Sequence, residues 1–150
     1  MCSLRRLMAE WEDAGWVNTE TNFADLVGKT LVSVQQDEDK QEILFGTDAG
    51  RKFLMYHEQD CCEGVYVESI VGELDWLVGA PILMAEEVTE EGRDVDSDGD
   101  FYGTHTWTFY KLATINGYVT IRWYGDSNGY YSESVSFVEI AGETSDECRT

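Results

Sequence analysis

The chain has 150 residues, 43% of them hydrophobic, which is enough material for one domain with a substantial core. Thirty acidic residues face ten basic ones, so the formal net charge at pH 7 is −20. This charge argues against nucleic acid as a direct ligand and against an anionic membrane surface, because binding to either depends on Lys and Arg. It favours a basic protein surface as the partner, or else a gain in solubility or salt tolerance.

No run of the sequence approaches the roughly 18 apolar residues that cross a bilayer, and no apolar signal core follows the N-terminus. The four cysteines are Cys2, Cys61, Cys62 and Cys148. Their spacing matches neither a secreted disulfide framework nor a pair of CxxC zinc hooks, so reduced thiols are expected. We therefore expect a soluble, cytoplasmic protein.

The first expected element is a short amphipathic helix within residues 1–16. Leu4, Leu7 and Trp11 recur at helical spacing. Ser3 is suited to cap this helix and Gly15 to end it.

From residue 30 the chain shows short runs rich in β-branched and aromatic residues, separated by acidic or Gly-containing turns. The spacing of these runs predicts an antiparallel meander over residues 30–36, 42–47, 51–57 and 64–72. Residues 73–78 fit one helical turn, and Pro81 is expected to open another strand.

The last third has the clearest strand pattern, with strands expected over residues 105–115, 117–125 and 130–140. The pair Asn116-Gly117 is expected to join the first two, because both residues tolerate the positive φ angles of tight hairpins. Residues 126–129 are expected to join the second and third. The polar tail over residues 142–150 is expected to fray.

Together these elements predict an α+β fold that is mainly antiparallel β. The expected architecture is one compact domain over residues 1–150, with a β-rich core over 25–141. The core is expected to be a single sheet or a barrel-like arrangement of six to eight strands, accompanied by the N-terminal helix.

A dense group of potential metal ligands follows the strand expected at residues 51–57. His57, Asp60 and the pair Cys61 and Cys62 would converge on one ion only if the chain turns at 58–60. Zinc accepts such a set, with His105 as a distant further ligand. The alternative is a buried turn in which the cysteines act as small apolar side chains and the polar groups form hydrogen bonds.

A second candidate metal site begins at residue 94. Asp94, Asp96, Asp98 and Gly99 match the first half of a calcium-binding loop. His105 occupies the twelfth position, where that motif requires a bidentate Glu. An EF-hand is therefore not expected, and weak calcium binding by an acidic hairpin loop is the alternative.

The stretch from residue 86 to residue 100 holds eight acids and one base. Mutual repulsion is expected to keep it extended and mobile, which makes it the best candidate for engaging a cationic partner. The residues expected to bind that partner are Glu86, Glu87, Glu90, Glu91, Asp94, Asp96, Asp98 and Asp100.

Aromatic residues gather with an arginine around the last predicted hairpin: Arg122, Trp123, Tyr124, Tyr130 and Tyr131. Such a set is typical of interface anchors, but cross-strand aromatic pairs also stabilise sheets, and we prefer the second explanation. The sequence contains no GxSxG, HExxH, P-loop or strand-linked GxGxxG motif, so no catalytic residue is assigned.

Three segments stand out as motifs: YHxQDCCE at residues 56–63, GxLxxLxGxPI at 72–82 and SNGYYSExVxF at 127–137. In these the chain resembles, over about residues 25–140, an uncharacterised family of small proteins found largely in bacteriophages. The resemblance implies a β-rich domain and a phage setting, and it brings no catalytic residues with it.

The leading hypothesis is a non-enzymatic acidic binding protein. It would be a phage-encoded inhibitor of a host defence or nucleic-acid-processing protein, acting by negative-surface mimicry in the cytoplasm of an infected bacterial or archaeal host. Its partner would be a basic protein surface, with no direct contact to nucleic acid or membrane and no required cofactor. The alternatives are a zinc- or calcium-binding β domain and a phage structural or accessory protein.

Overall fold

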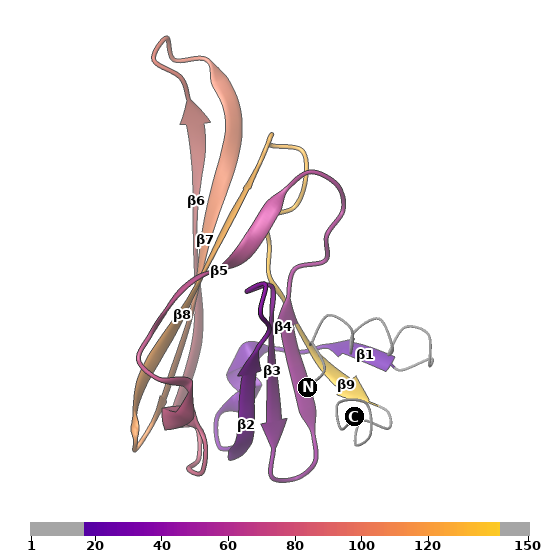
Figure 1. Ribbon diagram of the computed structural model, residues 1–150, viewed down its shortest axis with the longest axis vertical. Helices are drawn as coiled ribbons and strands as arrows, with labels where there is room; N and C mark the ends of the chain where they lie inside the picture. Colours follow the sequence, from indigo (N-terminus) through magenta and orange to yellow (C-terminus); the bar gives the residue numbers. More distant parts are fainter. Residues whose placement is uncertain (1–16, 142–150) are drawn as a thin grey trace.

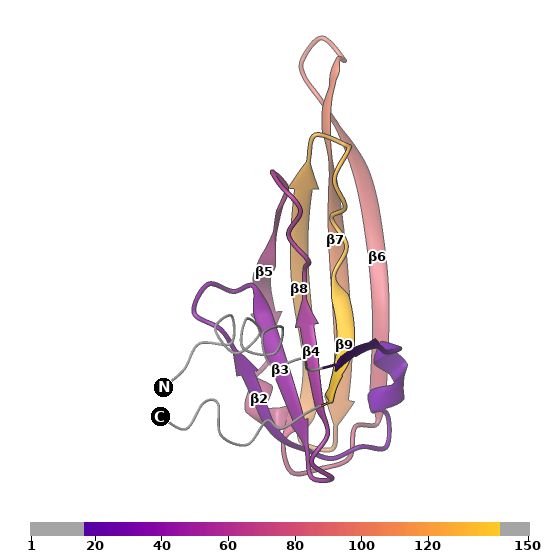
Figure 2. The same cartoon turned by 90° about the vertical axis from the view of Figure 1, so that its right-hand side faces the viewer.

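The computed structural model describes residues 17–141, which form two antiparallel β-sheets packed against each other (Figures 1 and 2). The helix expected within residues 1–16 and the tail expected over 142–150 lie outside the described residues. Helical structure in the described part is limited to two 3-10 turns, η1 (Phe23–Leu26) and η2 (Leu74–Leu77). The second confirms the turn predicted at 73–78. No helix in residues 17–141 has the length and hydropathy needed to span a bilayer.

The larger sheet has five strands in the order β1-β9-β4-β3-β2. They are β1 (Val17–Glu20), β9 (Ser136–Ala141), β4 (Lys52–Tyr56), β3 (Glu42–Thr47) and β2 (Leu31–Gln36). Short turns make β2, β3 and β4 antiparallel neighbours, which confirms the meander predicted for the first three runs. The fourth predicted run leaves this sheet.

The smaller sheet has four strands in the order β5-β8-β7-β6. They are β5 (Gly64–Val71), β8 (Gly117–Ser127), β7 (Phe101–Thr114) and β6 (Met84–Val95). The strand expected after Pro81 therefore takes in most of the acidic stretch, which pairs along its length with β7. The extended backbone predicted there is confirmed. The β6–β7 hairpin projects beyond the rest of the molecule (Figure 1).

Two predictions about the architecture are wrong. The nine described strands form two open sheets, not the predicted single sheet or barrel-like arrangement of six to eight strands. The run predicted at 130–140 does not complete a hairpin with the strand before it, because β9 begins at Ser136 and pairs with β4 and β1 in the other sheet. Alternation of apolar residues identifies the faces of a strand but not its neighbours, so the sequence did not assign strands to sheets.

The β7–β8 hairpin confirms the turn predicted from Asn116-Gly117 but gives the glycine another role. Thr114 pairs with Gly117, so Ile115 and Asn116 form the turn. A Cβ atom at Gly117 would lie 2.5 Å from Cε3 of Trp76 in η2. The position therefore requires glycine because an indole ring approaches the backbone closely there.

The main core lies between the two sheets. Trp123 of β8 is only 1% exposed, and its Nε1 donates to Sδ of Met55 in β4 at 3.1 Å. Phe137 of β9 stacks on Phe53 of β4 with ring centroids 5.6 Å apart, and Phe23 of η1 packs edge-on against Phe137 at 5.2 Å. Phe23 also packs edge-on against Tyr110 of β7 at 4.7 Å, so aromatic side chains of both sheets and of η1 meet in one core.

Substitution Trp123→Ala is expected to lower the free energy of unfolding by about 3–5 kcal/mol, because it empties the largest buried site between the sheets. Urea unfolding at neutral pH measures this change. The matched control is Tyr130→Ala, since Tyr130 is 82% exposed, and its effect should stay within about 0.5 kcal/mol. A loss at Trp123 no larger than that of the control would contradict the placement of this indole.

Candidate binding site at the sheet crossovers and the acidic hairpin

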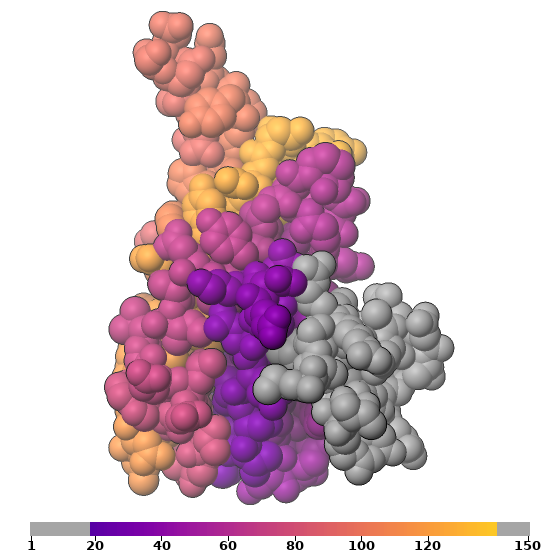
Figure 3. All heavy atoms as spheres, in the orientation of Figure 1, coloured from indigo at the N-terminus to yellow at the C-terminus, as the bar shows by residue number. Residues whose placement is uncertain are grey.

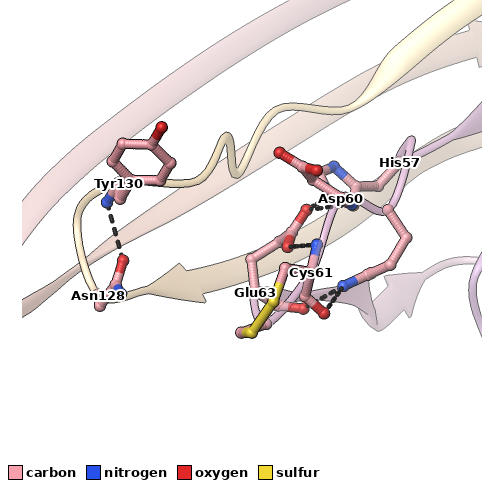
Figure 4. Close-up of a disulfide and its surroundings, with 8 residues drawn as sticks. His57, Asp60, Cys61, Glu63, Asn128 and Tyr130 are labelled. Carbon is pink, nitrogen blue, oxygen red and sulfur yellow. Dashed lines mark hydrogen bonds and ion pairs between the residues drawn. A yellow bond between two sulfur atoms is a disulfide. The ribbon is translucent and has the colours of Figure 1, made fainter.

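Within residues 17–141 the chain passes between the two sheets twice. The first crossover, residues 57–63, leads from β4 to β5, and the second, residues 128–135, leads from β8 to β9. The two crossovers lie side by side (Figure 4), and a hydrogen bond between His57 and Ser134 joins them. Each contains most of one sequence motif, YHxQDCCE or SNGYYSExVxF, so two segments far apart in the sequence form one site.

A disulfide joins the neighbouring residues Cys61 and Cys62 within the first crossover (Figure 4). The prediction of reduced thiols is therefore wrong for this pair, while Cys2 and Cys148 lie outside the described residues. Both bonded cysteines are exposed. The bond makes a small ring that includes the peptide bond between the two residues, and this ring restricts the backbone of the turn.

The carboxylate of Glu63 organises the turn from inside. Its side chain is 0% exposed. It accepts the backbone N–H of Asp60 at 2.9 Å and the backbone N–H of Cys61 at 3.0 Å. Nε2 of His57 donates to it at 2.7 Å. A buried carboxylate is stable only with such partners, so these three donors explain why an acid occupies the interior of the turn.

His57 links this carboxylate to the second crossover. Its Nδ1 lies 2.7 Å from the backbone oxygen of Ser134, and its Nε2 contacts Glu63. A carbonyl oxygen and an ionised carboxylate both accept hydrogen bonds, so both ring nitrogens must donate. The arrangement is satisfied by the doubly protonated imidazolium, and the side chain is only 4% exposed. His57 and Glu63 therefore form a buried ion pair that joins the two crossovers.

The hydrogen bonds around Glu63 also determine its ionisation. Burial alone raises the pKa of this carboxyl, but the N–H of Cys61, the imidazole of His57 and the N–H of Asp60 outweigh it. The pKa of Glu63 falls from its ordinary value of 4.5 to about 2. Glu63 is thus ionised throughout the physiological pH range.

The structure places the four predicted zinc ligands in one turn. Some of the atoms that would bind zinc already have other partners. The sulfurs of Cys61 and Cys62 are bonded to each other, and both ring nitrogens of His57 form hydrogen bonds. Asp60 is exposed, and His105 lies on β7. Among residues 17–141, no group of three or more His, Cys, Asp or Glu side chains is arranged to hold an ion. Zinc binding stays a prediction, and it would first require reduction of the disulfide.

The predicted calcium loop forms the tip of the β6–β7 hairpin. Asp94 pairs with His105, with 2.7 Å between Oδ1 and Nδ1. Oδ1 of Asp96 accepts the backbone N–H of Asp98 and that of Asp100, each at 2.9 Å. These contacts stabilise the turn with groups of the hairpin itself, as Asp side chains do in Asx turns. Calcium binding there also stays a prediction.

A second buried carboxylate fixes the second crossover to the hairpin. Glu133 is 8% exposed. It accepts hydrogen bonds from the hydroxyls of Thr104 and Thr106 on β7, at 2.5 and 2.8 Å. The hydroxyl of Ser127 on β8 donates to it at 2.5 Å. Two hydroxyl groups of β7 and one of β8 therefore hold the crossover against the inner face of the smaller sheet.

A groove of about 550 Å³ opens between this crossover and the inner face of the hairpin. Three elements line it: β6, β7 and residues 131–135. Glu87 and Glu91 of β6 point into it beside Arg93, and burial raises the pKa of Glu87. Carboxylates and hydroxyls dominate the lining, so the groove is suited to a cationic or hydrogen-bond-donating group.

The eight acidic residues predicted to bind a partner do not form one surface. Because side chains alternate along a strand, β6 directs Glu87 and Glu91 towards the groove. Glu86, Glu90 and Asp94 point to the opposite, outer face of the sheet, as their pairing with outer-face residues of β7 shows. The others are exposed at the hairpin tip: Asp96, Asp98 and Asp100.

The aromatic residues predicted to gather around one hairpin are distributed over three places. Trp123 is in the core. Arg122 and Tyr124 lie on the outer face of the smaller sheet, where both contact Trp107. Tyr130 and Tyr131 lie in the second crossover with ring centroids 5.0 Å apart.

The chain matches the family described as a domain of unknown function, DUF7448, over residues 24–137. The chain belongs to this family. The matched range contains both crossovers and the whole β6–β7 hairpin. No curated protein and no solved structure is detectably similar to the chain. The motifs suggested an uncharacterised family, and the match confirms this part of the resemblance. The phage origin stays a prediction.

Sequence reasoning missed the two carboxylates that hold the DUF7448 crossovers together, Glu63 and Glu133. Glu63 stands among other acids and Glu133 among serines and tyrosines, and a buried acid has the same letter as a solvated one. The available signal was position. Both follow directly on the small or polar residues of a turn and precede a strand, where backbone N–H groups and hydroxyls need acceptors.

Substitution Glu63→Gln is expected to destabilise the protein at pH 7 and to flatten its stability between pH 4.5 and 2. The folded pKa of Glu63 lies below its ordinary value. Its contribution is therefore complete above pH 4.5 and is lost as the pH falls through about 2. Urea midpoints across this range measure the effect. The exposed Glu58→Gln is the control, and equal pH profiles for the two variants would contradict the role of Glu63.

The Cys61–Cys62 bond predicts a specific alkylation pattern in protein purified without reductant. After denaturation, iodoacetamide should leave both residues unmodified, because neither has a free thiol. Pretreatment with a reductant should make both react, and the mass of the tryptic peptide that contains them measures this. Modification of either residue without reductant would show that the ring is open.

Proposed function

We propose that this DUF7448 protein is a non-enzymatic binding protein whose acidic hairpin engages a basic protein surface. We further propose that it is phage-encoded and acts in the cytoplasm of an infected bacterial or archaeal host. Its target would be a defence or nucleic-acid-processing protein, whose nucleic-acid-binding surface the carboxylates occupy in place of phosphates.

The observation that carries the proposal is the alignment of carboxylates along β6. An antiparallel strand rises roughly 3.4 Å per residue, so the five acids from Glu86 to Asp94 are spread over about 27 Å. A single DNA strand carries one phosphate per about 3.4 Å of helix axis, so β6 has a charge density of the same order when the acids of both its faces are counted. The strand is at the edge of its sheet, and the tip of the β6–β7 hairpin stands clear of the body (Figure 3).

The surroundings of β6 reinforce this negative field. No Lys or Arg occurs between residues 53 and 92, a range that includes β5, η2 and most of β6. Arg93 is the only base on β6, and its guanidinium lies over the ring of Phe101 at 4.4 Å. Few cations therefore compete with a partner for these carboxylates, so attraction to a basic surface should be strong at low salt and weaken as salt screens it.

The proposal assigns no catalytic role, and the two alternatives from the sequence stay predictions. A metal-binding domain would be recognised by elemental analysis of protein purified without chelator. A phage structural or accessory protein would be recognised by proteomics of purified particles.

Capture from a bacterial lysate at low salt, with and without competing double-stranded DNA, tests the proposal. The wild-type protein should retain basic nucleic-acid-binding proteins, and high salt should release them. Replacing the four glutamates of β6 with glutamine (E86Q/E87Q/E90Q/E91Q) should reduce retention about tenfold or more.

The matched control removes the same charge elsewhere, with the exposed residues of the E20Q/E38Q/D48N/E73Q variant. This control should retain the wild-type partners. Equal losses in the two variants would show that net charge rather than β6 is responsible. Failure of the wild type to retain any basic protein at low salt would end the proposal.

A further inference from the structure

The smaller sheet has an outer face that no described strand covers, and the strand register defines what it presents. One row runs from Glu90 of β6 through Trp107 of β7 and Tyr124 of β8 to Tyr66 of β5. Residues of a row are direct neighbours across the strands. Three of the four are aromatic, so an aromatic stripe crosses three of the four strands and ends beside Glu90 at the β6 edge.

The stripe is continuous, with Tyr66 exposed at its end and Trp107 and Tyr124 half-buried. The Trp107 and Tyr124 ring centroids are 4.6 Å apart, and those of Tyr66 and Tyr124 are 6.0 Å apart. Tyr66 is 39% exposed, as is Val88, which lies in the next row beside Phe109. Apolar side chains gathered on a solvent-facing sheet are typical of interaction surfaces, and Trp and Tyr are the residue types that anchor them.

Carboxylates surround the stripe. Those pointing to this face or standing at its rim are Glu68, Glu86, Glu90, Asp94 and Asp126. Burial, together with the charges of Asp126 and Asp94, raises the pKa of the Tyr124 hydroxyl. Arg122 and Lys111 lie on the same face, so the five carboxylates outnumber two fixed cations there. The aromatic rings therefore lie in a negative electrostatic field, which favours the approach of a cation over the approach of an anion or a second acidic surface.

The protein already holds an arginine on this face. The guanidinium of Arg122 lies 5.0 Å from the ring centroid of Trp107, and its Nη2 contacts Oε1 of Glu68 at 2.5 Å. Arg51 repeats the pattern in the larger sheet: it lies over Phe53 at 5.3 Å and forms a two-pronged ion pair with Glu139. In both cases a carboxylate and a ring hold one planar cation.

We propose that the outer face of the smaller sheet, centred on Tyr66, Trp107 and Tyr124, docks arginine side chains of a partner protein. The inference rests on the proposed function for the basic character of that partner, and it adds the surface and the residue type. Arginine fits better than lysine, because its planar group stacks on rings and pairs with carboxylates simultaneously, whereas lysine is a compact and strongly hydrated charge. A second copy of this chain fits poorly, since each copy carries a net charge of −20.

Two probe peptides test the proposal on the full chain: a short peptide of alternating Arg and Gly, and the same peptide with Lys at each Arg position. Calorimetry at low salt gives both affinities. The wild type should bind the Arg peptide about threefold or more tightly than the Lys peptide. The variant W107L/Y66L should lose this preference, and the control Tyr130→Leu, which changes an exposed tyrosine outside the face, should keep it.

A spectroscopic measurement on the wild type makes the test independent of how well the variants fold. The indole N–H signal of Trp107 should shift as the Arg peptide is added, while that of the buried Trp123 should not. Sedimentation of the free protein tests the alternative that a second copy of the chain occupies this face. A dimer that disappears in W107L/Y66L would assign the face to a second copy and overturn the proposal.

The two proposals fail in different ways. If both peptides bind the wild type equally, or if W107L/Y66L keeps the arginine preference, the aromatic face is not the docking surface. The role of β6 would stand in that case as long as the E86Q/E87Q/E90Q/E91Q variant binds both peptides more weakly than the wild type does. If neither peptide binds at low salt, the proposed function fails together with the further inference.

Discussion

The ion pair between Glu63 and His57 is the contact on which the arrangement of the two sheets depends. A buried carboxylate without partners is costly, so the backbone of residues 60–61 must keep its N–H groups turned inward. His57 then has one orientation that satisfies both its nitrogens, and that orientation points at Ser134 in the other crossover. One interior charge thus fixes the course of two segments that are more than seventy residues apart.

The consequences reach the acidic hairpin. With the second crossover held by His57, Glu133 meets the hydroxyls of β7, and the space left between crossover and hairpin becomes the groove. The disulfide also stabilises the first crossover, since a closed ring at residues 61–62 leaves the turn fewer conformations to lose on folding. The conspicuous residues of the YHxQDCCE and SNGYYSExVxF motifs therefore have a structural role that needs neither metal nor catalysis to explain it.

The sequence predicted the local elements better than their assembly. Runs such as 42–47 and 117–125 have an unmistakable strand composition, and the turn at residues 115–116 was placed within one residue. The sheet to which each strand belongs was not predictable, because pairing depends on the crossovers, and these depend on Glu63 and Glu133. The pairing of β6 with β7 was not predicted either, because acids dominate the strand and obscure the contribution of Val88, whose partner on β7 is Phe109. The adjacent cysteines gave no sign of their bond, since the usual disulfide signature is a spaced framework.

A surface that substitutes for phosphates must hold its charges in place, because ordering flexible side chains and loops on binding costs affinity. β6 meets this requirement by pairing along its length with β7, which is itself anchored by β8. The alternation of the strand then divides its acids between two environments. Glu87 and Glu91 enter a groove rich in hydroxyls, whereas Glu86 and Glu90 border an aromatic face. A single strand therefore supplies negative charge to two surfaces of different chemistry, and a partner that wraps the edge of the sheet would contact both. Specificity for one basic protein over another would then come from the rings and hydroxyls, because charge alone attracts every cationic surface.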